Sequence, residues 1–242
     1  MNTKQTVSFA QTPVSCQNCN LADLCLPYGL DLDEMAQLDT VIQHHAMLAR
    51  GDHIFTTQDA LKHIYAVKTG SIKTYQVTEN GNEQVMGFYL PGELIGLDAL
   101  HNNHHHCSAI ALESTSLCAL PMANLESISQ LIPHFQHTLY RAMGKEIVQD
   151  QTMLLTLAKH TADERIAAFL LNISQRFHLR GFSATEFNLS MARHDIANYL
   201  GLAVETVSRT FSRFQEEKLL TVSRKYIKIH DLDKLRAIIS SR

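Results

Sequence analysis

Four cysteines give this sequence its most distinctive chemistry. Three stand near the start of the chain in a C-x2-C-x5-C arrangement, and the fourth lies far along it: Cys16, Cys19, Cys25 and Cys118. Four thiolates that meet in space bind either zinc or an iron-sulfur cluster. Zinc sites usually show two close cysteine pairs, whereas clusters accept one remote ligand, so the spacing favours a cluster and leaves zinc as the alternative. If such a cluster decomposed, the N-terminal segment would lose its anchor, which is typical of a sensor.

The fifth cysteine, Cys107, follows a histidine-rich tract, HNNHHH at residues 101–106. Histidine tracts bind metal ions in some proteins, but no histidine here shows an i, i+4 spacing with a carboxylate. We therefore expect a solvated loop over this tract. We also expect a buried, unreactive Cys107 that lies outside the ligand set.

A second set of residues, near the C-terminus, suits the recognition of DNA bases. Gly201 fits the turn glycine of a helix-turn-helix, and Ala197 fits the close helix crossing. The second helix, from Val204 to about Lys218, is expected to bury one face: Val204, Val207, Phe211 and Phe214. The opposite face then presents the polar side chains that contact base edges in such motifs: Glu205, Ser208 and Arg209. Thr206 and Arg213 complete the predicted DNA-contacting set, with Arg213 nearer the phosphate backbone.

The composition is that of an ordinary globular protein. The chain has 242 residues, of which 45% are hydrophobic and 19% charged, and neither a signal peptide nor an apolar run of membrane-spanning length is evident. We expect a cytoplasmic protein with no membrane partner. Residues 1–160 carry 8 Lys and Arg against 15 Asp and Glu, whereas residues 161–242 carry 13 against 9. The basic C-terminal part agrees with binding to a polyanion.

Two patterns predict the elements that position these residues. Residues 54 to about 120 alternate short β-type runs with turns, and the runs at 71–77 and 84–90 flank Asn80-Gly81, which predicts a hairpin in an antiparallel roll. After a helical run at 163–177 and the helix-turn-helix, β-prone runs at 219–222 and 226–229 predict a wing.

A long helix is predicted from residue 133 to about residue 160. Six of its positions repeat at coiled-coil spacing: Tyr140, Met143, Ile147, Asp150, Leu154 and Leu157. This spacing favours a dimer, and the alternative is a helix packed on its own domain. Asp150 would face a like charge across a dimer, so such a dimer would be weak.

In these segments the sequence resembles the FNR/Anr-type oxygen-responsive regulators of the cyclic-AMP receptor superfamily. The resemblance extends over nearly the whole chain. It rests on CQNC at 16–19, LC at 24–25, ESTSLC at 113–118, GKEI at 144–147 and GLAVETVSR at 201–209. It implies an α+β fold in four parts: a cluster-binding segment (1–30), a cyclic-nucleotide-binding-like β-roll (31–132), a dimerisation helix (133–160) and a winged helix-turn-helix (161–242).

The resemblance also implies a function. The four cysteines named first would ligate a [4Fe-4S] cluster, which supports a DNA-binding homodimer without oxygen and converts when oxygen arrives. The implied DNA site is a palindrome with TTGAT-type half-sites, and the implied protein partner is RNA polymerase, contacted in part by the loop at Gly81-Asn82. Ile147 and Asp150, with Met143 and Leu154, would control dimerisation. The protein would be a transcription regulator and not an enzyme.

Three alternatives differ in chemistry. A cyclic-nucleotide regulator needs a Glu-Arg-Ser set, but aligning Gly96 places Leu97 at the glutamate and Cys107-Ser108 at the Arg-Ser pair, so the phosphate would lose its bidentate bond. An iron-sulfur enzyme would need an open iron or a cofactor loop, and neither is visible. The third alternative is a zinc-stabilised DNA-binding protein, which would have no sensing role. Asn20 and Asp23, between the second and third cysteines, are expected to alter oxygen reactivity.

Overall fold

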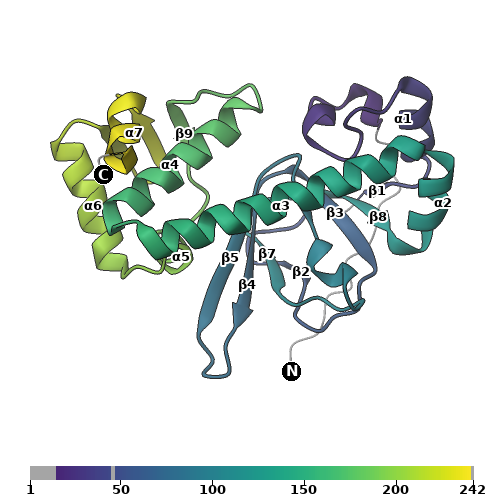
Figure 1. Cartoon of the computed structure of the whole chain (residues 1–242), viewed down its shortest axis with the longest axis horizontal. Helices are drawn as coiled ribbons and strands as arrows, with labels where there is room; N and C mark the ends of the chain where they lie inside the picture. Colours follow the sequence, from purple (N-terminus) through teal and green to yellow (C-terminus); the bar gives the residue numbers. More distant parts are fainter. Residues whose placement is uncertain (1–14, 45–46, 241–242) are drawn as a thin grey trace. The chain divides into compact units, whose positions relative to one another are not determined.

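The computed structural model describes residues 15–44 and 47–240. The described residues form two compact units (Figure 1). The first holds those up to Gln76 together with Met86–Glu146, and the second holds Val77–Val85 and those from Ile147 onward. Within the described ranges, no helix is long and apolar enough to cross a membrane.

Two four-stranded sheets with antiparallel pairing form the β-domain of the first unit. Their strand orders are β1-β8-β3-β6 and β2-β7-β4-β5. The first sheet consists of β1 (Gln43–His44), β8 (Ser116–Pro121), β3 (His63–Thr69) and β6 (Leu94–Ile95). The second consists of β2 (His53–Phe55), β7 (Ser108–Ala111), β4 (Ile72–Val77) and β5 (Glu83–Tyr89). Side chains from both sheets share one core, including Phe55, Val67, Ile72, Ala109 and Leu117. The predicted antiparallel roll is confirmed.

The predicted hairpin is also confirmed, with each strand end within one residue of its expected position. The turn between β4 and β5 contains Gly81 at φ +78°, a conformation that glycine adopts without strain. The Asn82 carbonyl accepts a hydrogen bond from the Thr78 N–H at 2.9 Å, which closes the turn.

Short helices occur in and around residues 15–25, which carry Cys16, Cys19 and Cys25 and which we call the cysteine segment. Two 3-10 helices, η1 (Cys16–Asn18) and η2 (Ala22–Leu24), precede α1 (Leu32–Asp39), and η3 (Leu97–Leu100), η4 (Met122–Asn124) and α2 (Leu125–Leu131) follow in the β-domain. A capping box between Asp31 and Glu34 begins α1. No regular structure was predicted around the cysteines, because 3-10 turns of three residues are too short to show periodicity.

Figure 1 shows α3 (Pro133–Lys159) as one uninterrupted helix, close to its predicted bounds. We call the six residues at coiled-coil spacing the α3 stripe. Tyr140, Ile147 and Leu154 of this stripe are 65%, 55% and 68% exposed, and Asp150 is exposed beside them. Met143 and Leu157 are partly buried. In the single chain, the α3 stripe is therefore largely open to solvent.

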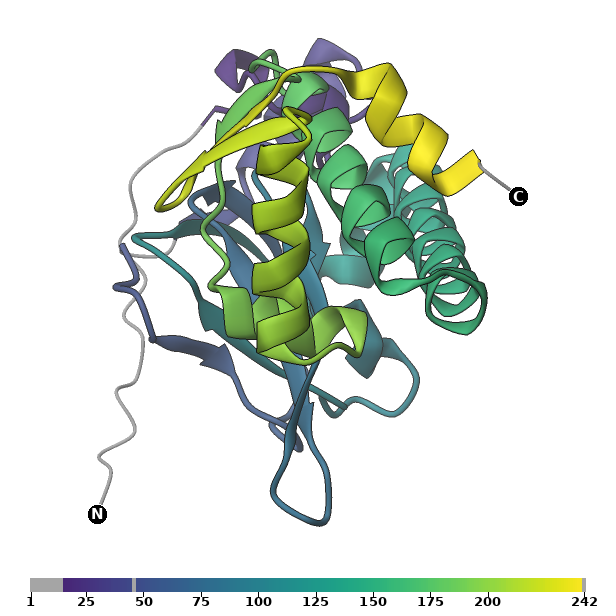
Figure 2. The same cartoon turned by 90° about the vertical axis from the view of Figure 1, so that its left-hand side faces the viewer.

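The second unit is a winged helix-turn-helix. Its helices are α4 (Ala162–His178), α5 (Arg193–Leu200), α6 (Val204–Glu216) and α7 (Leu232–Ser240), and its sheet has the order β10-β11-β9. The strands are β9 (Glu186–Asn188), β10 (Leu220–Ser223) and β11 (Tyr226–Ile229). Figure 2 shows α6 beside the β10–β11 hairpin, where the Val222 N–H donates to the Gln215 side chain at 2.8 Å. The predicted wing is confirmed, while β9 and α7 were not predicted.

The tip of the β4–β5 hairpin belongs to this second unit and is bonded to α5. The Asn198 side chain accepts the Val85 N–H at 2.5 Å and donates to the Glu83 carbonyl at 2.6 Å. The amide thus pairs with the edge of β5 as a neighbouring strand would.

Candidate cysteine centre and nucleic-acid interface

The four predicted ligand cysteines come from two remote segments that meet in the first unit. Cys16 lies in η1, Cys19 directly after it and Cys25 after η2, while Cys118 lies in the middle of β8, opposite Ala66 of β3. Cys16, Cys25 and Cys118 pack into the same apolar cluster, which also contains Leu26 and Leu120. All are free thiols.

Burial controls the acid-base behaviour of these thiols. Burial is the main reason why the pKa of Cys25 is raised to about 12; a hydrogen bond from the Leu26 N–H lowers this pKa, and the neighbouring Cys118 and Cys19 contribute to raising it. Burial likewise raises the pKa of Cys118 to about 11. The pKa of Cys16 is raised by burial and by Asp39, and also by Cys25 and Cys118. These groups lie within electrostatic reach of one another, and a bound metal would displace their protons.

The donor set fits a thiolate-bound metal centre. Four cysteine sulfurs suit both an iron-sulfur cluster and zinc. In the part of the chain that the structure describes, no three His, Cys, Asp or Glu side chains are arranged so that they could hold a single metal ion. The thiols are thus neighbours and not a preformed cage for one ion.

Asp39, at the end of α1, fixes the start of the cysteine segment. Its two carboxylate oxygens accept the Cys16 N–H at 2.7 and 3.0 Å. The other end of the segment packs on a turn of the β-domain, because a Cβ at Gly92 would lie 2.9 Å from the Leu24 Cβ. Sequence reasoning missed Asp39, since its partner is a backbone group 23 residues away. Asn20 and Asp23 are exposed between these anchors.

The histidine tract differs from the expected solvated loop at one position. His105 is only 2% exposed, and its ring stacks on Phe55 with centroids 3.6 Å apart. The other members of the tract are exposed as predicted. The sequence did not distinguish His105, because its aromatic partner lies in a distant strand. Cys107 is buried as expected, at 9% exposure.

The helix-turn-helix has the predicted turn and the predicted exposed face. Gly201 adopts the left-handed conformation at φ +61° and ends α5. Glu205, Ser208 and Arg209 are exposed on α6, and Thr206 is partly buried beside them. The opposite face buries Val207, Phe211 and Phe214.

Two details of α6 correct the sequence prediction. The helix ends at Glu216 and not near Lys218. Val204 is 39% exposed and not buried, because the first residue of a helix has no preceding turn to cover it.

One carboxylate organises the inner side of α6. Asp163, at the start of α4, accepts a hydrogen bond from the Thr210 hydroxyl at 3.1 Å, which explains a polar residue at a position that is usually apolar in this motif. The same carboxylate forms an ion pair with Arg213, whose Nε also lies 3.9 Å from Glu217. A phosphate contact by Arg213 remains a prediction, and it would compete with this pair.

Arg165 of α4 connects the ends of two helices, and sequence reasoning missed it. Its guanidinium donates to the Leu157 carbonyl at 2.7 Å and the His160 carbonyl at 3.0 Å, at the end of α3. It also donates to the Leu200 carbonyl at 2.9 Å, at the end of α5. A cation at these carbonyl ends satisfies groups that the helices leave unpaired.

Similarity to known proteins covers the two domains separately and also nearly the full length of the chain. The Crp-like helix-turn-helix domain family matches residues 164–238, and the cyclic nucleotide-binding domain family matches residues 46–130. The transcriptional activator protein Anr of Pseudomonas protegens is 45% identical over 229 residues, which cover 95% of this chain and 94% of the relative. This chain belongs to the FNR/Anr-type regulators of the CRP/FNR family.

Two further likenesses agree with this membership. The fumarate and nitrate reduction regulatory protein of Escherichia coli K12 is 45% identical to this FNR/Anr-type regulator over 222 residues, 92% of this chain and 89% of the relative. The solved structure of FixK2 from Bradyrhizobium japonicum superposes with a TM-score of 0.75 at 27% identity, covering 82% of this chain and 97% of the other. The FNR/Anr-type regulator is thus a DNA-binding transcription regulator of helix-turn-helix type and not an enzyme.

Proposed function

We propose that this FNR/Anr-type regulator controls the aerobic/anaerobic switch through a [4Fe-4S] cluster held by Cys16, Cys19, Cys25 and Cys118. The observation that carries the proposal is that Cys16, Cys25 and Cys118, from two remote segments, pack against one apolar cluster, with Cys19 within electrostatic reach of Cys25 and Cys118. The fumarate and nitrate reduction regulatory protein of Escherichia coli K12 is 45% identical over 92% of this chain, which supports anaerobic regulation as the task.

When bound, the cluster supplies an oxygen-labile link between the N-terminal segment and β8. The chain's own residues determine what happens on its loss. Without the link, the cysteine segment keeps the bond of the Cys16 N–H to Asp39 and the packing of Leu24 on Gly92. Both contacts flank the segment, so the exposed residues between them, Asn20 and Asp23, are expected to loosen around the buried Leu21.

The α3 stripe is the proposed homodimer contact. Its exposed apolar residues, Tyr140, Ile147 and Leu154, would be covered by the same residues of a second copy, with Met143 and Leu157 beside them. Asp150 lies among them, and although its side chain is exposed, partial desolvation by neighbouring protein groups raises the pKa of its carboxyl in the single chain. Pairing would desolvate two such carboxylates, which keeps the dimer weak unless the cluster supports it.

A two-fold dimer presents two copies of α6 and therefore matches a palindrome, for which we propose TTGAT-type half-sites. Glu205 would accept from a cytosine amino group, Arg209 would donate to guanine, and Ser208 and Thr206 would adapt to neighbouring groups. The exposed hairpin loop at Gly81-Asn82 is the proposed contact with RNA polymerase, in the cytoplasm where the DNA lies.

Metal analysis of protein purified without oxygen tests the cofactor. We expect brown protein with about four iron and four sulfide per chain. Cys118→Ser should abolish the colour, whereas Cys107→Ser is the matched control and should keep it. Colourless protein with one zinc per chain would refute the proposal, and a cluster that survives Cys118→Ser but not Cys107→Ser would show that the ligand set is wrong.

A further inference from the structure

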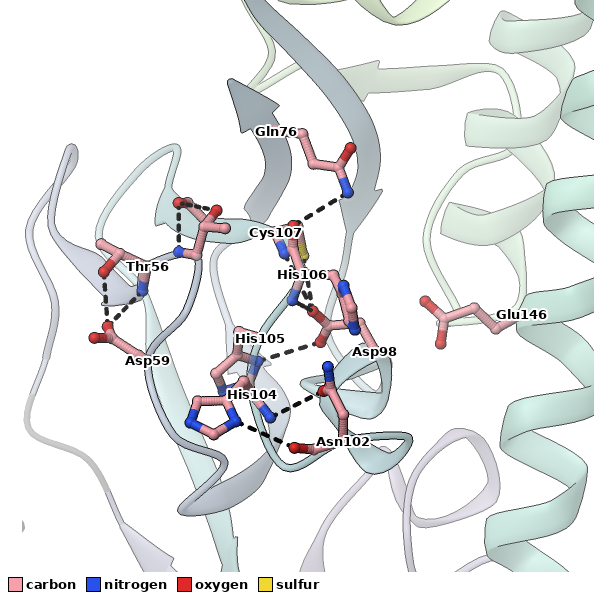
Figure 3. A network of polar contacts seen from close by, with 12 residues as sticks. Thr56, Asp59, Gln76, Asp98, Asn102, His104, His105, His106, Cys107 and Glu146 are labelled. Atoms are coloured by element: carbon pink, nitrogen blue, oxygen red, sulfur yellow. Dashed lines mark hydrogen bonds and ion pairs between the residues drawn. The ribbon is translucent and has the colours of Figure 1, made fainter. Parts of the chain in front are cut away.

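Asp98, at the start of the loop between β6 and β7, is bonded as an anionic ligand would be. Its Oδ2 accepts the His106 N–H at 2.8 Å and the Cys107 N–H at 3.3 Å, and the Cys107 Sγ lies at 3.4 Å (Figure 3). Its Oδ1 lies 3.2 Å from the His105 Nδ1. Consecutive backbone N–H groups that converge on one oxygen form an anion-binding nest.

Aligning Gly96 with the turn glycine of a cyclic-nucleotide-binding domain places this nest next to the residue pair that would hold the phosphate. Residues 46–130 match that domain, and Cys107-Ser108 aligns with the Arg-Ser pair that grips the phosphate. Here the Cys107 N–H is taken by Asp98. The Ser108 hydroxyl is also occupied, because it accepts the Thr57 N–H at 3.0 Å and lies 3.2 Å from the Thr57 hydroxyl.

The surroundings keep Asp98 charged and its partners in place. Burial raises the pKa of Asp98, but the hydrogen bonds from His105 and the His106 N–H outweigh this effect, so the pKa lies below its ordinary value. Burial, followed by the nearby Asp98, raises the pKa of the Cys107 thiol, which therefore stays protonated and can donate. The stacking of His105 on Phe55 fixes the ring that faces Oδ1.

A second carboxylate makes the same place unfavourable for an added anion. Glu146 of α3 accepts a hydrogen bond from the Tyr89 hydroxyl at 2.6 Å, and its charge contributes to the raised pKa of Cys107. Figure 3 shows Glu146 extending from α3 toward this part of the β-domain. A phosphate entering the nest would displace Asp98 and meet a further negative charge.

We propose that Asp98 is an internal anion that fills the phosphate subsite of this cyclic-nucleotide-type β-domain, so that the loop from Leu97 to Cys107 is closed without any ligand. The anion-binding N–H groups of the subsite are therefore occupied by the chain's own carboxylate. Removing the carboxylate should turn it into a site for a small external oxyanion, with inorganic phosphate or acetate as the chemical class.

Anion rescue of the full-length protein tests this proposal. Asp98→Ala leaves the His106 and Cys107 N–H groups without their acceptor and should lower the Tm by roughly 5 to 10 °C. Inorganic phosphate should restore part of this loss in a saturable way, compared with chloride at equal ionic strength. Asp52→Ala is the matched control, because the Asp52 carboxylate accepts one exposed N–H, from Ala49, in the same domain. Its Tm should respond to phosphate no more than that of the unchanged protein.

Hydrogen exchange on the unchanged protein gives a second readout if Asp98→Ala fails to fold. The peptide that covers residues 97–107 should exchange slowly, and neither phosphate nor 3′,5′-cyclic AMP should slow it further. Added protection by either compound would overturn the proposal, since the nest would then be open. The proposal also fails if Asp98→Ala folds and shows the same phosphate response as Asp52→Ala.

Discussion

Replacing Arg165 by alanine should loosen the second unit and weaken DNA binding together. The side chain makes three part-buried hydrogen bonds to the carbonyl ends of α3 and α5. A hydrogen bond to a charged group contributes about 1.5 to 3 kcal/mol, and partial exposure reduces this to about 1 kcal/mol for each bond here. The expected loss is then about 3 kcal/mol, or a fall in Tm of roughly 10 to 20 °C for a unit of about 100 residues.

The loss should extend to function because α5 packs against α6 through the turn at Gly201, next to the Leu200 carbonyl that Arg165 holds. Arg165→Lys keeps the charge, but a single ammonium cannot reach the carbonyls of two helices at once. The Tm of Arg165→Lys should therefore lie between those of the unchanged protein and Arg165→Ala. Thermal unfolding by circular dichroism and titration with a TTGAT-type palindrome, both without oxygen, would measure the two effects.

Arg236→Ala provides the control for this experiment. Arg236 is 62% exposed and pairs with Asp233 on the surface of α7, an arrangement that contributes well under 1 kcal/mol. Its Tm and DNA affinity should stay close to those of the unchanged protein. If Arg165→Ala behaves like Arg236→Ala, the guanidinium does not connect the two helices and the reasoning is refuted.

The remaining predictions concern the dimer, the DNA contacts and the cysteine segment. Asp150→Ala should raise the dimer fraction of cluster-free protein by removing a pair of like charges, and an unchanged monomer in sedimentation at matched concentration would refute the role of the α3 stripe. Glu205→Ala should reduce discrimination at one base pair by about 1 to 3 kcal/mol. Equal losses of affinity for all single-base variants of the palindrome would show that the base-reading face of α6 is misassigned. Arg213→Ala should weaken binding to all sequences alike and reduce the salt slope by about one unit, and an unchanged slope would contradict the phosphate contact. Asp39→Ala should lower the iron retained in anaerobic protein and speed alkylation of Cys16 after cluster removal, and Asp39→Asn should give intermediate values of both. Equal rates of Cys16 alkylation in the unchanged protein and in Asp39→Ala would exclude the anchoring role of Asp39.

The elements that the sequence specified locally were predicted well. The Asn80-Gly81 turn requires a backbone conformation that few residues adopt, and so it located β4 and β5 within one residue. Gly201 did the same for the turn between α5 and α6. The α3 helix carries a periodic pattern over many turns, and its predicted and observed bounds agree closely.

The features that depend on distant partners were not predictable. β9 has only three residues, and Phe187 is its one buried position, so its pairing with β11 has no periodic signal. His105 is buried because Phe55 lies against it, and its five neighbours in the tract are exposed. Asp39 and Arg165 act on backbone groups, which have no side-chain identity to mark the partner. Cys118 could be grouped with the three N-terminal cysteines because clusters accept one remote ligand, but only the resemblance pointed to a [4Fe-4S] cluster in particular.

One measurement tests most directly whether the cysteine centre controls the regulator. A single anaerobic sample would be followed by its visible spectrum and by analytical ultracentrifugation, before and after exposure to air. We predict that the iron-sulfur absorption and the dimer fraction fall together, and that Cys118→Ser is colourless and monomeric under both conditions. A sample that loses its colour in air while its sedimentation and its binding to the palindrome stay unchanged would contradict the account.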